Sequence, residues 1–217
     1  MRIAVLGTGM VGRGLGGRFA ELGHSVTIGT RDPERVTSDG GEYALWLAAE
    51  PTIDTRTFAE AAAAGEVVIN ATNGHVSLDV LQLAGEENLA GKVLIDVANP
   101  ITFGDDGLEL LTADTDSLGE QIQRAFPTAR VVKALNTMNV SVMVNPGQLE
   151  GAGSVFVAGD DAAAKDIVTT LLGELGHAEV VDLGDISGAR GTEMWLMLWV
   201  RLMQSLGTPT FNIKIIR

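Results

Sequence analysis

The stretch from Arg2 to Gly12, RIAVLGTGMVG, decides the fold that the rest of the sequence must fit. A short apolar run leads into a GxGxxG loop at Gly7, Gly9 and Gly12, and a helical pattern follows. Glycines at this spacing permit a tight turn, close approach of the backbone to a pyrophosphate, and close packing of helix on strand. The start of the helix then offers free N–H groups to phosphates. A glycine-rich turn without a ligand is the alternative, but the flanking strand and helix favour dinucleotide binding.

A second stretch, VTIGTRDPE, bears on which dinucleotide binds. It reads as the end of a strand running into a loop and a new helix, where the adenosine ribose should lie. An acidic residue there would accept the ribose hydroxyls, whereas Arg31 offers bidentate hydrogen bonds to a 2′-phosphate. Thr30 adds a hydroxyl, and Arg35 can reach back from the next helix. Asp32 followed by Pro33 is typical of an N-cap with proline at N1, which gives it a structural role. We therefore predict NADP rather than NAD.

Short apolar runs alternate with helical patterns along most of the chain, as in parallel sheets covered on both faces. The strand candidates are Arg2–Leu6, Ser25–Gly29, Val67–Ala71, Lys92–Val97, Arg130–Ala134, Ser154–Gly159 and Ala178–Leu183. The helix candidates are Val11–Leu22, Tyr43–Ala49, Thr57–Ala64, Ser77–Ala90, Ser117–Ala125 and Asp161–Leu175. This alternation predicts an α/β fold, a Rossmann-type doubly wound, mostly parallel sheet with a C-terminal apolar helix. We see no linker, so we expect residues 1–217 to form a single NADP-binding domain.

The composition excludes several classes of function. Of 217 residues, 46% are hydrophobic and 20% charged, which is an ordinary globular balance. The net charge of −13 argues against a general nucleic-acid or membrane-surface binder, since both need basic patches. Cysteine is absent, which excludes disulfides, thiolate metal sites and thiol catalysis, and we expect no metal. The amino terminus has no signal-peptide layout and no apolar segment is long enough to span a bilayer, so we expect a cytoplasmic protein.

The carboxyl end departs from the alternation. Ser187 is a candidate cap for a helix through Thr192–Ser205 that stops at Gly207. Its tryptophans, methionines and leucines are too many for one amphipathic stripe, so the helix needs cover on several sides. We expect residues 187–217 to serve an acceptor site or a homodimer interface. The alternative is a helix packed on its own sheet with a few exposed apolar residues.

Candidates for acid–base catalysis are few. A dehydrogenase acting on an alcohol moves a proton with the hydride and needs a positioned acid or base. The candidates are His75, Lys133, Arg190 and Glu193. No recognisable motif joins any of them to a second titratable residue, and a solvated or loop-packing role explains each at least as well. The last helix also has no lysine where β-hydroxyacid dehydrogenases place theirs. We therefore predict no catalytic side chain.

At this point the residues suggest a family, because the chain resembles the F420-dependent NADP oxidoreductases. The resemblance is carried by MRIAVLGTGMVGRGL, LGHSVTIGTRDPER, KVLIDVANP, VVKALNTM and the tail FNIKIIR. It covers nearly the whole length and is most specific in the first 35 residues. The resemblance implies a Rossmann domain that carries hydride directly between NADP(H) and a deazaflavin, coenzyme F420. Direct transfer accounts for the missing acid or base, because the chemistry belongs to the cofactors.

The resemblance also implies where these molecules bind, and the glycine loop adds Gly7 and Gly12. The implied cofactor contacts are Thr8, Gly9, Met10, Val11, Thr30, Arg31, Arg35, Ala71, Thr72, Asn73, Val76, Ala98, Asn99, Pro100, Leu135 and Asn136. The walls around the deazaflavin are expected in Ala98–Thr102, Asn136–Met143, the last helix and the tail Phe211–Arg217.

Three functional classes stay open from the sequence. The first is an oxidoreductase that links NADP(H) to F420. The second is an NADPH-dependent reductase of another acceptor, such as a flavin, a ferric complex or an imine. The third is a non-catalytic sensor of NADP(H) with a partner surface on the last helix. In each class we expect a small-molecule ligand, a homodimer, and neither nucleic acid nor membrane as a partner.

Overall fold

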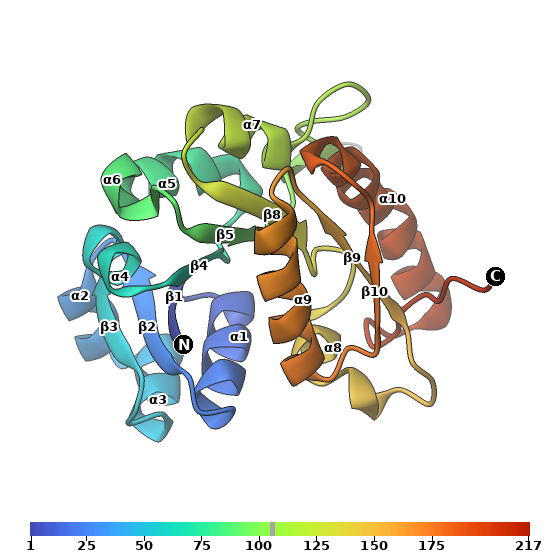
Figure 1. The fold of residues 1–217 in the computed structure, drawn as a ribbon. Helices are drawn as coiled ribbons and strands as arrows, with labels where there is room; N and C mark the ends of the chain where they lie inside the picture. The colour runs from blue at the N-terminus through green and yellow to red at the C-terminus, as the bar shows by residue number, and fades with distance from the viewer. Residues whose placement is uncertain (105–106) are drawn as a thin grey trace.

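The structure is built on one large sheet (Figure 1). The computed structural model describes residues 1–104 and 107–217. Within these residues an eight-stranded sheet has the strand order β10-β9-β8-β5-β4-β1-β2-β3. Its strands are β1 (Arg2–Leu6), β2 (Ser25–Thr30), β3 (Asp54–Thr57), β4 (Val67–Asn70), β5 (Val93–Asp96), β8 (Arg130–Ala134), β9 (Ser154–Ala158) and β10 (Glu179–Asp182).

The order of these strands creates a crevice. Strands β1 to β5 and β8 are parallel, whereas β9 and β10 pair in parallel with each other and run antiparallel to β8. The chain moves outward from β1 through β2 and β3, and then from β4 through β5 and β8 on the other side. The order therefore reverses between β1 and β4, where ligands of such sheets bind outside the carboxyl ends of the strands. The predicted mostly parallel, doubly wound α/β fold is confirmed.

Helices cover both faces of the sheet, and each face has its own apolar core. One core contains residues of α1 (Met10–Glu21), α3 (Glu42–Ala49), α8 (Val140–Val144) and α9 (Ala162–Leu175). The other contains residues of α4 (Phe58–Ala64), α5 (Ser77–Ala84), α6 (Glu86–Leu89) and α7 (Leu118–Ala125). Successive side chains of a strand point to opposite faces, so Val5 belongs to the first core and Leu6 to the second. Strand β1, which leads into the glycine loop, is therefore anchored in both cores.

The remaining elements are short, apart from the last helix. They are α2 (Pro33–Ser38), the single turns η1 (Gly74–Val76), η2 (Pro146–Gln148) and η3 (Ile186–Gly188), and α10 (Ala189–Leu206). The long helix α10 ends at Gly207, whose φ of +68° gives the predicted left-handed cap. Among the helices of the described residues, none has the length and apolar character needed to cross a membrane.

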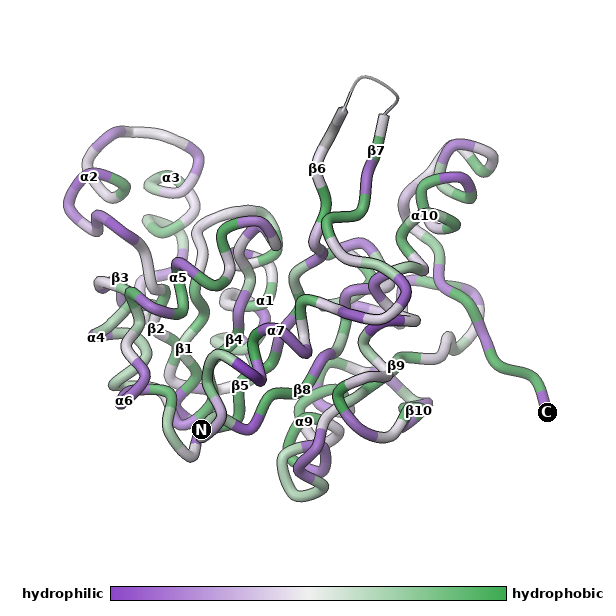
Figure 2. Tube along the Cα trace, turned by 90° about the horizontal axis from the view of Figure 1, so that it is seen from above, coloured by the Kyte–Doolittle hydropathy of each residue, from purple (hydrophilic) through white to green (hydrophobic). Residues whose placement is uncertain are grey.

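Two features were not expected from the sequence. Strand β3 reads Asp-Thr-Arg-Thr and lies at the edge of the sheet beside β2, so it carries no buried apolar pattern. The strands β6 (Ile101–Gly104) and β7 (Gly107–Leu110) form a separate antiparallel hairpin. Figure 2 shows this hairpin standing out from the body of the molecule beside α10. Each strand that was expected is present, with ends that differ by at most one residue.

Two predictions about helices were wrong. The expected helix Ser77–Ala90 is broken, because Gly85 takes a φ of +90° between α5 and α6. Ser187 does not cap the last helix, since it lies inside η3, where the Asp185 side chain accepts a hydrogen bond from the Ser187 N–H. The helix begins two residues later, at Ala189.

Candidate functional site

A continuous cleft runs along the carboxyl ends of the strands, and its two halves share Met10, Val11 and Ala71–Asn73. The β2-side half, about 440 Å³, is also lined by Gly7, Thr8, Gly9, Thr30, Arg31, Phe58, Val76 and Val80. The α10-side half, about 220 Å³, is also lined by Val97, Ala98, Asn99, Ile101, Asn136, Met138, Asn139, Val140, Met143, Leu196 and Trp199. A long, two-part ligand could therefore lie across the switch point with Thr72 near its middle.

The glycine loop forms the floor of the β2-side half. Gly7 has a φ of +122°, which favours glycine, and a Cβ at Gly12 would lie 2.0 Å from the Gly7 carbonyl oxygen. These two glycines therefore allow the tight turn and the close packing of α1 on β1. A Cβ at Gly9 would meet nothing within 4 Å, so Gly9 leaves open space on the cleft side. Helix α1 starts at Met10 without a side-chain cap, which leaves its first N–H groups free for an anion.

Basic side chains lie at one end of this half. Arg31, just after β2, is exposed and lines the cleft, and Thr30 beside it is buried. Arg35 is also exposed, on the first helical turn that follows. Within residues 1–104 and 107–217, neither arginine forms an ion pair. Asp32 is the predicted N-cap, and its carboxylate accepts from the Arg35 N–H at 3.0 Å. Two guanidinium groups are thus free to meet a phosphate.

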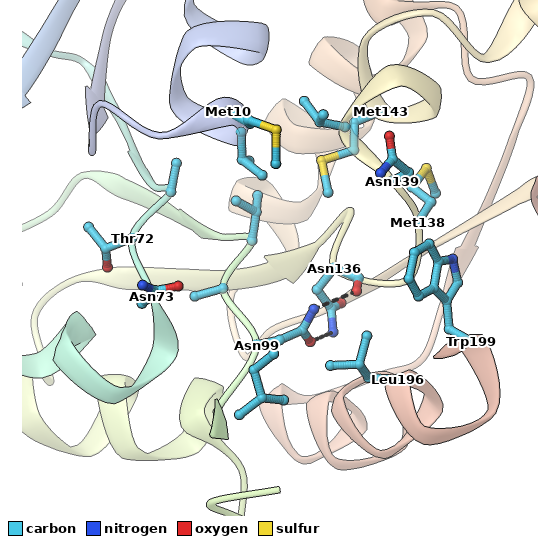
Figure 3. Close-up of a pocket in the computed structure, with 16 residues that line it drawn as sticks. Met10, Thr72, Asn73, Asn99, Asn136, Met138, Asn139, Met143, Leu196 and Trp199 are labelled. Atoms are coloured by element: carbon cyan, nitrogen blue, oxygen red, sulfur yellow. Dashed lines mark hydrogen bonds between the residues drawn. The ribbon is translucent and has the colours of Figure 1, made fainter. Parts of the chain in front are cut away.

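Two asparagines bridge the loops after β5 and β8 in the α10-side half (Figure 3). Asn136 Nδ2 donates to Asn99 Oδ1 at 3.1 Å, and Asn99 Nδ2 donates to the Asn136 carbonyl oxygen at 2.9 Å. The backbone turns sharply to place Asn136 there, because Leu135 has a φ of +64° and the Asn136 N–H bonds back to the Ala134 carbonyl at 2.8 Å. This is a γ-turn of the rare, strained kind, which is often found at functional sites.

The rest of the α10-side half is apolar. Met138 and Met143 come from the segment after β8, and Leu196 and Trp199 come from α10 (Figure 3). Trp195, on the preceding turn of α10, donates its indole N–H to the Thr137 carbonyl at 3.2 Å and ties the helix to this segment. The sixteen residues drawn in Figure 3 include no acid, base or histidine. This half therefore suits a flat, largely apolar ring with amide groups at its edge.

Most of the predicted site residues line the cleft. The following do so: Gly7, Thr8, Gly9, Met10, Val11, Thr30, Arg31, Ala71, Thr72, Asn73, Val76, Ala98, Asn99 and Asn136. Gly12, Arg35, Pro100 and Leu135 do not line it. No pattern in the sequence indicates Phe58 and Val80 as site residues, because apolar residues on α4 and α5 are expected to serve the core in any case.

The four acid–base candidates lie outside the cleft lining. His75 is exposed in η1. Arg190 on α10 forms a two-pronged ion pair with Glu120 of α7, so it helps to attach the two helices to each other. Lys133 and Glu193 are buried, so the solvated or loop-packing role considered for them from the sequence is wrong. Their side chains pair with each other, with Lys133 Nζ 2.8 Å from Glu193 Oε1.

Lys133 belongs to a buried ionic cluster that the sequence did not reveal. Its Nζ lies 2.8 Å from Asp96 Oδ2 and donates at 2.5 Å to the Ala98 carbonyl oxygen. Burial lowers the pKa of Lys133, but Asp96 and Glu193 raise it by more, so its pKa lies above the usual lysine value. The ammonium group stays charged at neutral pH and cannot act there as a base. Residues far apart in the chain form this cluster, so no local motif could have indicated it.

The carboxyl-terminal tail lies mainly against β9 and does not line the cleft. Ser154 on β9 donates its N–H to the Ile213 carbonyl at 2.8 Å, and the Ile215 N–H donates to the Ser154 hydroxyl at 2.9 Å. Phe211 stacks on Trp199, which lines the cleft, with ring centroids 5.5 Å apart and an interplanar angle of 19°. The tail is thus not among the residues that wall the cleft, contrary to the expectation from the sequence, and it contacts the wall residue Trp199 instead.

Comparison with known proteins finds F420-dependent reductases among the relatives of this chain. Residues 2–100 match the family model described as NADP oxidoreductase, coenzyme F420-dependent. The F420-dependent NADP reductase of Methanothermobacter marburgensis is 30% identical over 213 residues, which cover 93% of this chain and 92% of that protein. A crystal structure from Arthrobacter sp. FB24, provisionally named an F420-dependent NADP reductase, is 55% identical with a TM-score of 0.98 and covers 100% of both chains.

A relative of another kind is also similar over most of the chain. The metalloreductase STEAP3 of Rattus norvegicus is 29% identical over 210 residues, or 96% of this chain. This chain spans 38% of the length of that protein. The likeness therefore concerns one part of the rat enzyme.

Proposed function

This chain belongs to the family of F420-dependent NADP oxidoreductases, and we propose that it transfers a hydride directly between NADP(H) and the deazaflavin F420 without a side-chain acid or base. The observation that supports direct transfer is the composition of the α10-side half. Its sixteen lining residues are apolar, amide-bearing or a hydroxyl, and none titrates near neutral pH. An enzyme that activates an alcohol needs such a group, whereas transfer between two cofactor rings does not.

NADP would occupy the cleft with its phosphates in the β2-side half. The free N–H groups at the start of α1 and the open space at Gly9 fit a pyrophosphate. Arg31 and Arg35 have the charge and the planar fork that bind a 2′-phosphate, and Thr30 adds a hydroxyl nearby. The dinucleotide would then pass Thr72 and place the nicotinamide beside the Asn99–Asn136 pair. The loops that carry this pair would orient the ring.

The deazaflavin would lie against the nicotinamide on the α10 side. Hydride transfer is the chemistry that the two rings supply, and it requires the reacting carbons to approach to about 3–3.5 Å. The protein contributes orientation and exclusion of water. Met138, Met143, Leu196 and Trp199 provide pliable apolar walls for a flat ring, and the exposed amide of Asn73 is available for its polar edge.

The decisive experiment is mixing the protein with NADPH and oxidised deazaflavin while recording the deazaflavin absorbance. We expect rapid bleaching of the deazaflavin and much slower reduction of FAD and FMN. Equal rates with FMN or a ferric chelate would favour a reductase of another acceptor. Binding of NADPH without reduction of any acceptor would favour the sensor hypothesis.

A second candidate function is reduction of a different acceptor, such as a ferric complex through a flavin. It is favoured by one observation, the 29% identity to a rat metalloreductase over 96% of this chain. The 30% identity to a named F420-dependent reductase over 92% of that protein's length weighs more, because it concerns a whole protein of similar size.

We also propose that two copies associate through the outer face of α10. Met197 and Leu198 are neighbours on this helix and are 43% and 51% exposed, so they give its outer face two large apolar side chains. Light scattering of the protein and of Leu198→Glu would test this. The proposal requires a dimer that the substitution weakens, and a monomeric parent protein would contradict it.

A further inference from the structure

Asp96, Lys133 and Glu193 form a buried ionic cluster that contacts the cleft walls without lining the cleft. Each of the three residues is at most 1% exposed, and they come from β5, β8 and α10. The two carboxylates and one ammonium leave one negative charge in excess. Charges in such a place are costly unless their hydrogen bonds are satisfied. The contacts of each member therefore show what the cluster holds in place.

The cluster fixes the loop that follows β5. Lys133 Nζ donates to the Ala98 carbonyl oxygen at 2.5 Å, and Asp96 Oδ1 accepts from the Ala98 N–H at 3.2 Å. Both polar groups of the Ala98 backbone are thus held by side chains of the cluster. Ala98 lines the α10-side half, and the next residue is Asn99 of the asparagine pair.

A chain of hydrogen bonds extends from the cluster to the middle of the cleft. Asp96 Oδ1 also accepts from Asn70 Nδ2 at 2.8 Å, and Asn70 Oδ1 accepts from the Thr72 hydroxyl at 2.6 Å. Asn70 is completely buried, while Thr72 lines both halves of the cleft. The floor of the nicotinamide region is thus connected to the cluster through side chains alone.

The third member connects the cluster to the opposite wall. Glu193 Oε2 accepts from the Leu118 N–H at 2.8 Å, and Oε1 accepts from the Gly119 N–H at 3.1 Å. These groups belong to the first turn of α7, whose positive dipole end suits the excess negative charge. Leu196 and Trp199 follow on α10 at one and nearly two helical turns from Glu193, and both line the cleft.

We propose that Asp96, Lys133 and Glu193 are positioning residues that fix the nicotinamide loop relative to the α10 wall, and so set the distance between the two reacting rings. The cluster is the one direct ionic link, among the described residues, between the strand ends of β5 and β8 and helix α10. This positioning role of the cluster rests on the proposed function, hydride transfer between NADP(H) and deazaflavin. A displacement of about 1 Å between reacting groups can lower a rate on the order of a hundredfold.

The test uses the double variant Asp96→Asn/Lys133→Met. It removes one charge of each sign, so the net charge of the cluster is unchanged, and Glu193 keeps its N–H donors on α7. The link from Ala98 to α10 is lost. We expect the single-turnover rate of hydride transfer to deazaflavin to fall about tenfold to a hundredfold. The Kd for NADPH should stay within about twofold, because the phosphate contacts lie in the other half.

The matched control is Glu120→Gln. Glu120 is also nearly buried and also joins α7 to α10, through Arg190, but it makes no contact with the cluster. We expect this variant to lose stability and to keep the hydride-transfer rate of the folded protein. A double variant that is folded by circular dichroism and transfers hydride at the parent rate would overturn the proposal. So would an equal loss of rate in Glu120→Gln, because helix attachment alone would then explain the effect.

If the double variant Asp96→Asn/Lys133→Met does not fold, the test uses Glu193→Gln in its place. This substitution keeps one acceptor oxygen for Lys133. The same drop in hydride-transfer rate with unchanged NADPH affinity is expected, and an unchanged rate would contradict the proposal. Failure of the proposed function is distinguishable, since the parent protein itself would then show no bleaching of deazaflavin.

Discussion

Asn136 and Asn99 hydrogen-bond to each other twice across the α10-side half, side chain to side chain at 3.1 Å and side chain to backbone at 2.9 Å. The two residues lie on loops that follow β8 and β5, strands that are neighbours in the sheet. Asn136 is 2% exposed, and the positive φ of Leu135 turns it towards Asn99. The backbone is strained at Leu135, and this strain places Asn136 where it forms both hydrogen bonds with Asn99. Such strain indicates that the position of the pair matters for the site.

We therefore predict that Asn99→Ala lowers both stability and hydride transfer. It leaves the buried Asn136 amide and carbonyl without these partners, which costs about 1–3 kcal/mol of unfolding free energy. The NADPH affinity should change little. Urea unfolding and stopped-flow measurements would check this. The control is Asn88→Ala, because Asn88 also donates to a backbone carbonyl, that of Ala84, but lies away from the cleft. Parent-like kinetics in Asn99→Ala would contradict a role for the pair in placing the nicotinamide.

Arg31→Thr should change the preference between the two nicotinamide dinucleotides. A charge-assisted hydrogen bond to phosphate contributes roughly 1.5–3 kcal/mol, so NADPH affinity should fall about tenfold to a hundredfold while NADH affinity stays nearly constant. Fluorescence titration with both cofactors measures this. Arg124→Thr is the control, because Arg124 is an exposed arginine on α7 that pairs with Asp116. Equal affinities of the parent protein for NADH and NADPH would refute the assignment of Arg31.

Two glycines of the loop should respond in opposite ways to alanine. Gly9→Ala puts a Cβ into open space at an ordinary φ of −72°, so the stability should be nearly unchanged. The same methyl group would occupy the place of the pyrophosphate, and we expect NADPH binding to be strongly weakened. Gly12→Ala puts a Cβ 2.0 Å from the Gly7 carbonyl, so the fold itself should lose stability. Thermal unfolding and NADPH titration of both variants would check this, and tight NADPH binding by Gly9→Ala would be the contrary result.

His177 should make stability depend on pH near neutrality. Its Nε2 bonds to the Met143 carbonyl at 3.0 Å, and burial lowers its pKa, an effect that this hydrogen bond only partly opposes. The unfolded chain therefore takes up a proton near pH 6.5, before the folded protein does, and stability falls as the pH drops below that value. The loss is at most about 1.4 kcal/mol per pH unit. Urea unfolding at pH 7.5 and 5.5 should show a larger drop for the parent than for His177→Gln. Equal drops would show that His177 does not contribute.

Much of this architecture could be predicted because it is local. The apolar runs and the glycine loop predict the strands and their order of appearance, and Asp32–Pro33 predicts the start of α2. The short polar strand β3 could not be found in this way, since it depends on pairing with β2 for its existence. Gly85 breaks a helix that its neighbours favour, because it takes a positive φ.

The same distinction between local features and long-range contacts applies to the residues of the site. In the β2-side half, the glycine loop, Thr30 and Arg31 come from one βαβ unit with a known spacing, so their positions follow from the sequence. The contacts of Lys133 with Asp96 and Glu193 join residues that are 37 and 60 positions away in the chain, as 133 − 96 and 193 − 133 give. Nothing near Lys133 in the sequence shows which carboxylates it meets. Only the packing of α10 against the sheet brings the second carboxylate to it.

The last prediction concerns Trp199, whose position depends on the tail. Phe211 stacks on it with ring centroids 5.5 Å apart, and the Trp199 indole nitrogen is buried without a hydrogen-bond partner among the described residues. Stacking on Phe211 therefore helps to fix this ring, since its nitrogen makes no polar contact among the described residues. Aromatic pairs contribute about 0.5–1.5 kcal/mol beyond the area they bury. We expect Phe211→Ala to free Trp199 to reorient in the α10-side half.

In Phe211→Ala the KM for deazaflavin should rise about threefold to tenfold, in line with an aromatic pair of that strength. The Kd for NADPH should stay unchanged, because the phosphate end of the cleft is lined by other elements. Ile216→Ala is the matched control, since Ile216 belongs to the same tail and is 89% exposed. Steady-state kinetics with both substrates measures the difference. A rise in KM that is equal in both variants would mean that the tail acts through its attachment to β9, and an unchanged KM in Phe211→Ala would show that Trp199 holds its place without the stack.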